Sequence, residues 1–536
     1  MRKKKLSIYD TTLRDGAQGE GVSFSLSAKL RLARRLDEMG VDCIEGGYAG
    51  SNEKDMAFFR EIKAEPLRHA RIAAFGSTRR ARMRVQDDPF VQALIQADTP
   101  VATVYGKAWD MHVRKALRTT LRENLAMIAD TVGYLKDNGK DVIFDAEHFY
   151  DGYVARPDYA MACIEAARGA GADTLALCDT NGGRLPHEIG AATREVCDAM
   201  SCPIGFHGHN DSGLAVANTL EAVRAGATQV HCTVNGYGER CGNANLCTLV
   251  PALELKMGYT CLAPGRLARM RDLALFTEEL VNVRHDSKAP YVGHSAFSHK
   301  GGPHVNAVKK NPTTYEHVSP DAVGNTRRIL ISELSGGANV LLKAIELGIG
   351  RRESTTGARD ILKALKTMES QGYAFESADA SFQMLIQKTL EKHKSFFDLE
   401  GFRVIVEKRG KNEPCLSEAT LKVRVKSDIE QTVAEGDGPV NALDRALRKA
   451  LTRFYPSIAD VSLTDFRVSI LDPEEATAAK TRVLIESGDG KNVWRTIGVS
   501  ENIIEAAWQA LLDSVEYKLF MEEKRKLKRR KPGKRR

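Results

Sequence analysis

Residues 204–243 read IGFHGHNDSGLAVANTLEAVRAGATQVHCTVNGYGERCGN. A short apolar run carries two histidines one residue apart, His207 and His209, and is followed by a helix-like stretch, a second apolar run and a glycine-rich loop. Short runs that are apolar on both faces, with helices between them, are typical of buried parallel strands. We therefore expect this stretch to contain two neighbouring strands of a parallel sheet and the helix that connects them.

Similar apolar runs recur along the first half of the chain. They cover residues 6–13, 42–47, 71–77, 100–106, 141–149, 173–180, 203–210 and 229–236. Helix-like stretches separate them, and eight such units in about 250 residues match the size of a (β/α)8 TIM barrel. An open doubly wound sheet is the alternative, but its usual G-x-G-x-x-G turn is missing after the first run. The sequence therefore predicts the α/β class with an N-terminal TIM barrel.

The chain of 536 residues is too long for one hydrophobic core. We expect a barrel at 1–260, a mostly helical linker subdomain at 261–395, a C-terminal domain at 396–520 and a disordered basic tail at 521–536. The linker contains a stretch rich in His, Gly and Pro at 295–318, which we expect to be a loop.

The basic character of the chain belongs to its tail. Ten Lys and Arg residues lie in 524–536, and without them the formal net charge of +8 becomes −2. We expect a solvated end with at most a weak, salt-sensitive attraction to polyanions, and no specific nucleic-acid binding. No apolar run reaches the roughly 18 residues of a membrane span, and no signal-peptide h-region is present. The ten cysteines contain no C-x-x-C pair, so we expect reduced thiols in a cytoplasmic protein.

The C-terminal part contains an internal repeat. Residues 417–451 and 477–517 share a strand-rich segment followed by a helix. In the first copy, Leu421, Val423 and Val425 alternate with charged residues, as in a half-buried strand. We predict a small pseudo-symmetric α/β domain.

The two histidines predict a metal site. Residues i and i+2 of a strand face the same side, so His207 and His209 both project into the C-terminal end of the barrel, where barrel enzymes have their sites. The first strand leads to Arg14 and Asp15, and in a closed barrel strands one, eight and seven are neighbours. Asp15 can therefore approach both imidazoles. Two His and one carboxylate leave positions free for substrate and water, and Mn²⁺, Mg²⁺, Co²⁺ and Zn²⁺ all remain possible.

Other residues are expected at the same end of the barrel. Arg14 forms a salt bridge to Asp15 or Glu45, or it binds an oxyanion or a substrate carboxylate. Glu147 and Thr180 end the fifth and sixth strands. Strand-end residues expected to set the pocket are Tyr48, Phe75, Tyr105 and Asp145. In the glycine loop, Asn243 could supply a further metal oxygen, and we expect Cys241 to be a small packed side chain.

These motifs resemble a known superfamily. LRDGAQ at 13–18, followed by Lys29, and HGHNDSGLAVAN at 207–218 resemble the two signatures of the DRE-TIM metallolyases. That superfamily includes 2-isopropylmalate, homocitrate and citramalate synthases and HMG-CoA lyase. IEGGYAGSNEKD, DAEHFYDGY, SAFSHKGGPHVNAV and EGDGPVNALD resemble the long-chain class of (R)-citramalate synthases.

The resemblance implies an acyltransferase that condenses acetyl-CoA with pyruvate and water to (R)-citramalate and CoA, opening a threonine-independent route to isoleucine. It implies metal ligation by Asp15, His207, His209 and Asn243. Arg14 would offset charge on the keto oxygen and Thr180 would bind the substrate carboxylate. The base would be His304, acting with Glu147 and Tyr315. In related synthases this segment comes from the partner subunit, which implies a homodimer.

The repeat domain resembles the allosteric domain of these synthases, with isoleucine as the expected effector. Backbone N–H groups near Gly436, Gly438 and Ala442 would bind its carboxylate at a helix N-terminus; a plain helix cap is the alternative. For the reaction, the alternatives are a condensation like that of 2-isopropylmalate or homocitrate synthase with another 2-oxo acid, a lyase, and a metal-binding regulator without catalysis.

Overall fold

The computed structural model describes residues 4–50, 52–65, 67–283, 286–300, 302–329, 355–375, 378–390, 395–471 and 479–530. The chain divides into two compact units, Met1–Phe297 with Glu316–Arg327, and Ser298–Tyr315 with Arg328–Arg536, and each is described by itself. Among the described residues, none of the helices combines the length and apolar character that crossing a lipid bilayer requires.

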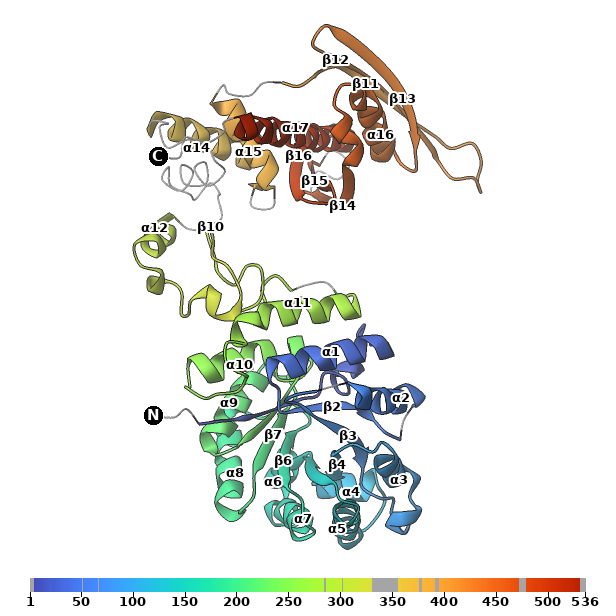
Figure 1. The fold of residues 1–536 in the computed structure, drawn as a ribbon, viewed down its shortest axis with the longest axis vertical. Coiled ribbons are helices and arrows are strands. Elements are labelled where there is room, and N and C mark those ends of the chain that lie inside the picture. The colour runs from blue at the N-terminus through green and yellow to red at the C-terminus, as the bar shows by residue number, and fades with distance from the viewer. Residues whose placement is uncertain are drawn as a thin grey trace. The chain divides into compact units, whose positions relative to one another are not determined.

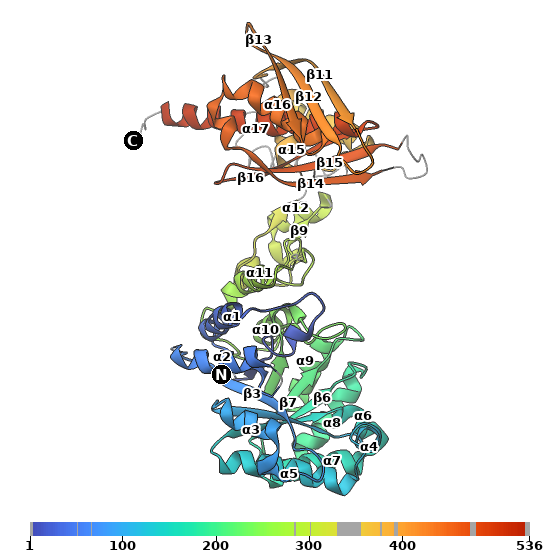
Figure 2. The ribbon, with the colours of Figure 1, turned by 90° about the vertical axis from the view of Figure 1, so that its right-hand side faces the viewer.

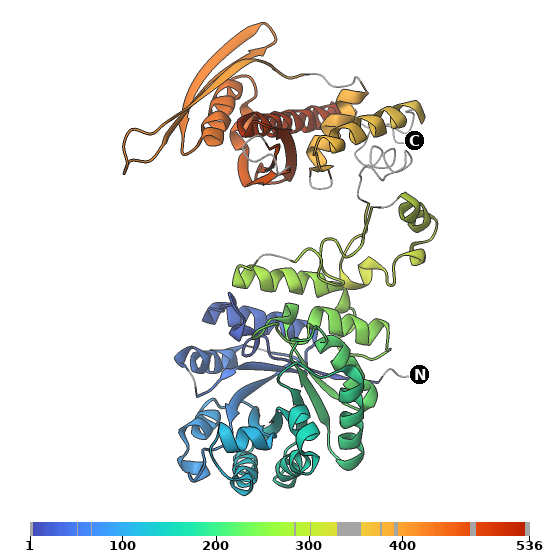
Figure 3. The ribbon, with the colours of Figure 1, turned by 180° about the vertical axis from the view of Figure 1, so that it is seen from behind.

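The first unit is built around a closed barrel of eight strands in chain order. Figures 1 and 3 show the strands at the centre, with helices around them. The strands are β1 (Ser7–Asp10), β2 (Cys43–Tyr48), β3 (Arg71–Ser77), β4 (Val101–Lys107), β5 (Asp141–Glu147), β6 (Thr174–Asp179), β7 (Ile204–Gly208) and β8 (Gln229–Cys232). All neighbours are parallel, and β1 pairs with both β2 and β8. The predicted barrel is confirmed and the open sheet is excluded.

Eleven α-helices in the described residues of this unit follow or flank the strands. They are α1 (Leu26–Met39), α2 (Glu53–Glu61), α3 (Pro89–Gln96), α4 (Asp110–Lys115), α5 (Leu121–Asp137), α6 (Phe149–Ala155), α7 (Pro157–Gly169), α8 (Pro186–Ala199), α9 (Ala215–Ala225), α10 (Leu246–Leu255) and α11 (Met270–Val281). In α1, the Ser25 side chain accepts a hydrogen bond from the Ala28 N–H, and Gly40 ends the helix at φ +87°. Its Leu32, Ala33 and Leu36 are buried in the core between helices and strands.

The second unit begins with a part that differs from the prediction of a loop at 295–318. Helix α12 (Gly302–Lys310) lies within that stretch. Two short strands, β9 (Ser298–His299) and β10 (Arg328–Ile329), pair in parallel. Helices α14 (Thr355–Ser370) and α15 (Asp379–Thr389) follow, and residues 330–354 lie outside the described part of the chain.

The predicted repeat is confirmed in the remainder of this unit (Figure 2). The first copy is a three-stranded antiparallel sheet and a helix: β11 (Asp398–Glu407), β12 (Leu416–Val425), β13 (Asp428–Gly436) and α16 (Pro439–Thr452). The second copy is β14 (Ser462–Ile470), β15 (Thr481–Gly488), β16 (Val493–Ser500) and α17 (Ile503–Arg530). Alternate residues of β12, including the predicted Leu421, Val423 and Val425, are buried in one core that both copies share.

The predicted disordered tail is wrong for residues 521–530. Helix α17 continues through them to Arg530, and residues 531–536 lie outside the described part. Lys, Arg and Leu are good helix formers, and extending an existing helix avoids the cost of nucleation. The composition of the tail therefore does not require disorder.

Candidate active site

The candidate metal ligands meet at the C-terminal ends of the barrel strands, which we call the barrel mouth. His207 belongs to β7, and His209 follows it directly. β1 ends at Asp10, earlier than the predicted run of residues 6–13, and Asp15 lies in the turn after the strand, beside the short 3-10 helix Gly16–Gln18. The pairing of β1 with β8, and of β8 with β7, brings this turn beside the histidines.

The geometry of the three side chains fits one cation. Asp15 Oδ2 lies 3.3 Å from His207 Nε2 and 3.8 Å from His209 Nε2, and the two Nε2 atoms lie 3.3 Å apart. Ligands that each lie about 2.0–2.2 Å from one ion are separated by roughly 3–3.6 Å. All three residues are buried. The described part of the chain contains one such group of three His, Cys, Asp or Glu side chains.

Asn243 completes the group from the loop after β8. Its Nδ2 donates to Asp15 Oδ2 at 2.8 Å and lies 3.4 Å from His207 Nε2, whereas its buried Oδ1 has no hydrogen-bond partner. Gly238, at φ +157°, allows this approach, because a Cβ there would lie 1.9 Å from Asn243 Oδ1. The orphaned amide oxygen lies against Gly238, whereas the amide nitrogen faces Asp15 and His207, so the predicted ligand role requires the oxygen and nitrogen of this amide to exchange places.

The charges of the site favour cation binding. Burial alone would raise the pKa of Asp15, but the positive charge of Arg14 and the hydrogen bond to His207 outweigh it and hold this pKa well below its ordinary value. Burial and the neighbouring His207 lower the pKa of His209 to about 4. The site therefore offers an ionised carboxylate and at least one neutral imidazole, the protonation states of metal ligands.

Arg14 is fixed by two carboxylates at the edge of this group. Its Nε donates to Glu45 Oε2 at 2.6 Å, an Nη lies 3.5 Å from Asp15 Oδ1, and its guanidinium lies 3.8 Å from the centre of the Phe75 ring. Burial would lower its pKa, but the charges of Glu45 and Asp15 raise it above the ordinary value. Both predicted salt bridges are present, and the side chain still reaches the cavity, so the structural and functional roles coexist.

A cavity of about 220 Å³ opens beside the predicted ligands. The four residues predicted to set the pocket all line it, namely Tyr48, Phe75, Tyr105 and Asp145. Three of them form an aromatic wall, with ring centroids of Phe75 and Tyr105 at 5.3 Å and of Phe75 and Tyr48 at 5.6 Å. Thr180 and Glu147 also line the cavity. The Thr180 hydroxyl accepts a hydrogen bond from the His148 N–H at 2.8 Å.

The sequence analysis did not name every residue that lines or flanks the cavity; Lys107 and Arg240 are two that it missed. Lys107 ends β4 and forms an ion pair with Glu147. Arg240 lines the cavity, donates from Nε and Nη to both oxygens of Asp211 at 2.6 and 2.9 Å, and donates to the Thr180 carbonyl at 2.9 Å. The strand-end argument applied to Glu147 would have found Lys107. Cys241 beside Arg240 is exposed, so the prediction of a packed side chain is wrong.

His304 and Tyr315 belong to the second unit. Both are exposed, and their rings stack with centroids 4.2 Å apart. The structure thus brings these two candidates together, on α12 and after the 3-10 helix Pro312–Thr314.

The predicted effector residues lie where β13 leads into α16. Gly436 ends β13, Gly438 precedes the helix, and Ala442 is buried in its first turn. A cavity of about 460 Å³ lies beside this turn, between α16 and β14. It is lined by Val440, Asn441, Asp444, Arg445, Arg448, Val461, Ser462, Leu463 and Phe466.

Comparisons with known proteins agree with this architecture. Residues 5–274 match the HMGL-like family, residues 291–372 the homocitrate synthase post-HMGL domain-like family, and residues 376–519 the LeuA allosteric (dimerisation) domain. The (R)-citramalate synthase of Geobacter sulfurreducens is 53% identical, covering 97% of this chain and 98% of its own. That of Synechocystis sp. is 51% identical, covering 97% of each chain. A probable 2-isopropylmalate synthase of Methanopyrus kandleri is 34% identical, covering 95% of this chain and 98% of its own. The chain belongs to the (R)-citramalate synthase family of enzymes.

Proposed function

We propose that the protein condenses acetyl-CoA with pyruvate and water to form (R)-citramalate and CoA, the first step of a threonine-independent route to isoleucine. The observation that carries this proposal is identity above 50% with two (R)-citramalate synthases over almost the whole chain. The cavity of about 220 Å³ beside Arg14 is also small, as a three-carbon 2-oxo acid requires. Condensation with a larger 2-oxo acid is favoured less, because the 2-isopropylmalate synthase is the more distant relative.

Asp15, His207, His209 and Asn243 would hold a divalent ion, with Mn²⁺, Mg²⁺, Co²⁺ and Zn²⁺ as the candidates. When bound, such an ion acts as a Lewis acid on a keto oxygen. The set of one carboxylate, two imidazoles and one amide does not select one of these metals.

The substrate would be oriented by residues of the cavity wall. Glu45 holds Arg14 in a fixed position. The Arg14 guanidinium would stabilise the negative charge that develops on the keto oxygen during the reaction. The Thr180 hydroxyl, fixed by the His148 N–H, would donate its own proton to the carboxylate of pyruvate. The aromatic wall excludes water and limits the size of the group beside the keto carbon.

A base must remove a proton from the acetyl methyl group. We assign this role to His304, with Tyr315 stacked on it and Glu147 as a partner from the barrel mouth. Glu147 also forms an ion pair with Lys107, which holds the Glu147 side chain in position at the barrel mouth. Water then hydrolyses the citramalyl-CoA thioester.

The test of the reaction is a thiol-release assay with acetyl-CoA and a panel of 2-oxo acids, with and without divalent metal. Pyruvate should give the highest kcat/KM, and chelation should abolish CoA release. Equal or faster release with 2-ketoisovalerate or 2-oxoglutarate would overturn the assignment of the substrate. No release with any of them would overturn synthase chemistry.

The cavity beside α16 is the proposed isoleucine site. Asp444 Oδ1 and one Nη of Arg448 are buried there without hydrogen-bond partners, although the two side chains pair at 2.8 Å through other atoms. An amino acid offers an ammonium to such a carboxylate and a carboxylate to such a guanidinium or to the free N–H groups of the helix N-terminus. Val461, Leu463 and Phe466 supply an apolar wall for its side chain.

We also propose a homodimer, and the cytoplasm as its location, in keeping with ten unpaired cysteines. The LeuA-type domain leaves apolar side chains exposed on its sheets, among them Ile429 (47%), Val433 (42%) and Val468 (42%). Such exposed apolar surface marks interaction sites. Inhibition by isoleucine should be lost in Asp444→Asn while basal turnover persists, and Val433→Asp should produce monomers in sedimentation experiments. Unchanged inhibition or an unchanged dimer would refute the respective proposal.

A further inference from the structure

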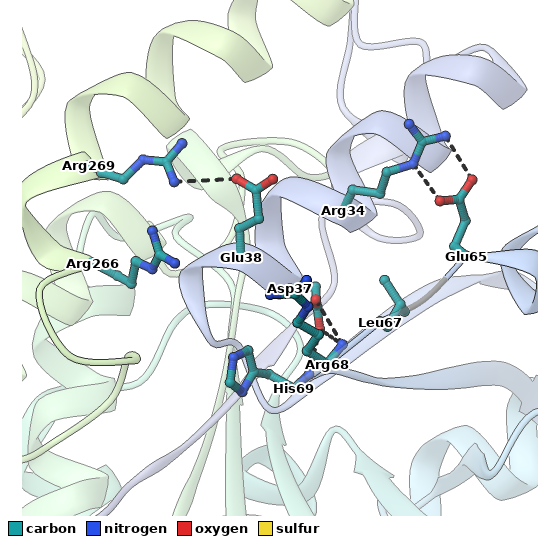
Figure 4. A pocket seen from close by; sticks show the side chains of 9 residues that line it. All are labelled: Arg34, Asp37, Glu38, Glu65, Leu67, Arg68, His69, Arg266 and Arg269. Carbon is teal, nitrogen blue, oxygen red and sulfur yellow. Dashed lines mark hydrogen bonds and ion pairs between the residues drawn. The ribbon is translucent and has the colours of Figure 1, made fainter.

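A second cavity of the first unit lies away from the barrel mouth (Figure 4). Its volume is about 470 Å³. Its walls come from α1, from the segment that leads into β3 and from the short 3-10 helix Leu267–Arg269 with the residue before it. Because that segment enters β3 at its N-terminal end, the cavity lies at the end of the barrel opposite the metal ligands. It shares no residue with the catalytic cavity.

Two of its arginines are already neutralised. Arg34 pairs with Glu65 at 2.8 Å, and Arg269 pairs with Glu38 at 3.3 Å. Figure 4 shows these two pairs on opposite sides of the cavity. These two ion pairs hold the walls of the cavity in position, and Arg34 and Arg269 therefore contribute little unpaired positive charge.

The cavity lining contains one more acidic residue besides Glu38 and Glu65, namely Asp37, and its carboxylate binds backbone N–H groups. Its carboxylate accepts hydrogen bonds from the N–H groups of Arg68, His69 and Ala70 at 2.7–3.0 Å. Burial raises the pKa of Asp37, but these hydrogen bonds outweigh it and lower the pKa below its ordinary value. Asp37 therefore holds the loop in place and is not available to pair with a side chain of the cavity.

Two guanidinium groups remain without a counter-charge. For Arg68 and Arg266, no ion pair or side-chain hydrogen bond exists within the residues that the structure describes. The Arg266 side chain extends toward Glu38 and Asp37, and His69 lies next to Arg68 (Figure 4). Four arginines against three acids give the lining an excess of positive charge even with His69 neutral.

We propose that this cavity binds a small, hydroxyl-bearing phosphate monoester, with its phosphate between Arg68 and Arg266. Arginine forks bind phosphate oxygens in pairs, and two free guanidinium groups match the charge of about −1.5 to −2 on a phosphate monoester at neutral pH. The volume lies in the range of small-molecule sites, roughly 300–1,000 Å³, and leaves room for more than the phosphate. Among the described residues of the lining, Leu67 is the apolar one, whereas Glu38 and Glu65 offer oxygens that accept hydrogen bonds from hydroxyl groups.

The test is isothermal titration calorimetry of the full chain with ribose 5-phosphate, inorganic phosphate and ribose as probes. Ribose 5-phosphate should bind saturably at one site per chain, inorganic phosphate more weakly and ribose not at all. Arg68→Gln and Arg266→Gln should each weaken binding by roughly tenfold or more, because each removes a charge-assisted contact. Both variants should keep the basal kcat, since neither residue lies at the barrel mouth.

The control is Arg71→Gln, which makes the same charge change at the start of β3 but outside the cavity, where Arg71 pairs with Asp141 at 2.6 Å. Its affinity for ribose 5-phosphate should equal that of the wild type. Arg68→Lys and Arg266→Lys keep the charge and guard against loss of folding; they should bind more weakly than the wild type and more tightly than the Gln variants. Absence of saturable binding at millimolar ester, equal affinity for inorganic phosphate and the ester, or equal weakening by Arg71→Gln would each overturn the proposal.

Discussion

The carboxylate of Asp15 lies 3.3 Å from His207 Nε2, although Asp15 follows the first strand of the barrel and His207 lies in the seventh. Barrel closure through β8 creates this contact. Asp15 is also the one carboxylate among the candidate ligands, so it supplies the negative charge that a divalent ion requires.

Asp15→Asn should therefore abolish turnover and weaken metal binding. The loss of metal affinity should exceed the roughly 10- to 100-fold loss that is typical when a residue that only supports a metal ligand is removed. Calorimetry with Mn²⁺ and the thiol-release assay measure the two effects. Asp98→Asn is the matched control, because Asp98 is exposed and paired with Lys63 far from the ligands. Retention of metal affinity in Asp15→Asn would remove Asp15 from the ligand set.

The aromatic wall should set the preference for the 2-oxo acid. Tyr48→Ala removes one of the three rings that surround a cavity of about 220 Å³. The ratio of kcat/KM for 2-ketoisovalerate to that for pyruvate should rise by about tenfold or more, within the range that a change of a methylene or two produces. Tyr48→Phe keeps the ring and should leave the ratio near that of the wild type. An unchanged ratio in Tyr48→Ala would show that this wall does not face the substrate.

The bidentate ion pair between Arg240 and Asp211 helps to connect three loops of the barrel mouth. It joins the loops after β8 and β7, and its bond to the Thr180 carbonyl adds the loop after β6. Arg240→Gln and Asp211→Asn should each lower metal affinity by about tenfold, because both loosen the loop that carries Asn243. The double variant should be no worse than either single one, giving a coupling of about 1.4 kcal/mol, the equivalent of one tenfold loss. Arg224→Gln, which breaks an exposed pair with Glu221 on α9, is the control. If the losses of metal affinity in the two single variants add up in the double variant, Arg240 and Asp211 act independently and the proposed coupling is wrong.

Residues 436–442 offer a matched pair of glycines. A Cβ at Gly436 would lie 2.4 Å from the Ala442 nitrogen, whereas a Cβ at Gly438 would meet nothing within 4 Å. Gly436→Ala should lower the free energy of unfolding by about 1–3 kcal/mol through overpacking. Gly438→Ala should change it by less than about 0.5 kcal/mol. Urea unfolding followed by circular dichroism measures both free energies. Equal stability of the two variants would contradict the close contact between Gly436 and Ala442.

Much of the barrel was predictable because its strands are buried on both faces. Val142, Ile143 and Phe144 of β5, for example, are consecutive and all buried, so the run stands out in the sequence. Strand ends were less predictable: β1 stops at Asp10, five residues before Asp15, because the segment after it turns into a loop that the apolar pattern does not mark.

Side-chain pairing across the site was harder to predict. The contacts of Arg240 with Asp211 and of Lys107 with Glu147 join different loops or strands, and ion pairs of this kind have no periodic signature. His304 was named through resemblance alone, since it lies outside the barrel strands. The free arginines of the second cavity were not anticipated, because only the folded loop shows that Asp37 binds the backbone.

Asp37 also makes stability depend on pH. Because hydrogen bonds lower its folded-state pKa, its contribution is complete above the ordinary value of about 3.9 and is lost as the pH falls through the lower folded-state pKa. Asp37→Asn keeps an acceptor oxygen but loses the charge, so it should cost about 1–2 kcal/mol of unfolding free energy at pH 7. The difference from the wild type should persist at pH 5 and shrink below pH 4 in urea unfolding. Asp158→Asn, at an exposed acid of α7, should show no such difference. If the difference in unfolding free energy between Asp37→Asn and the wild type stays constant down to pH 3, the lost stability comes from altered packing or hydrogen-bond geometry rather than from the lost charge.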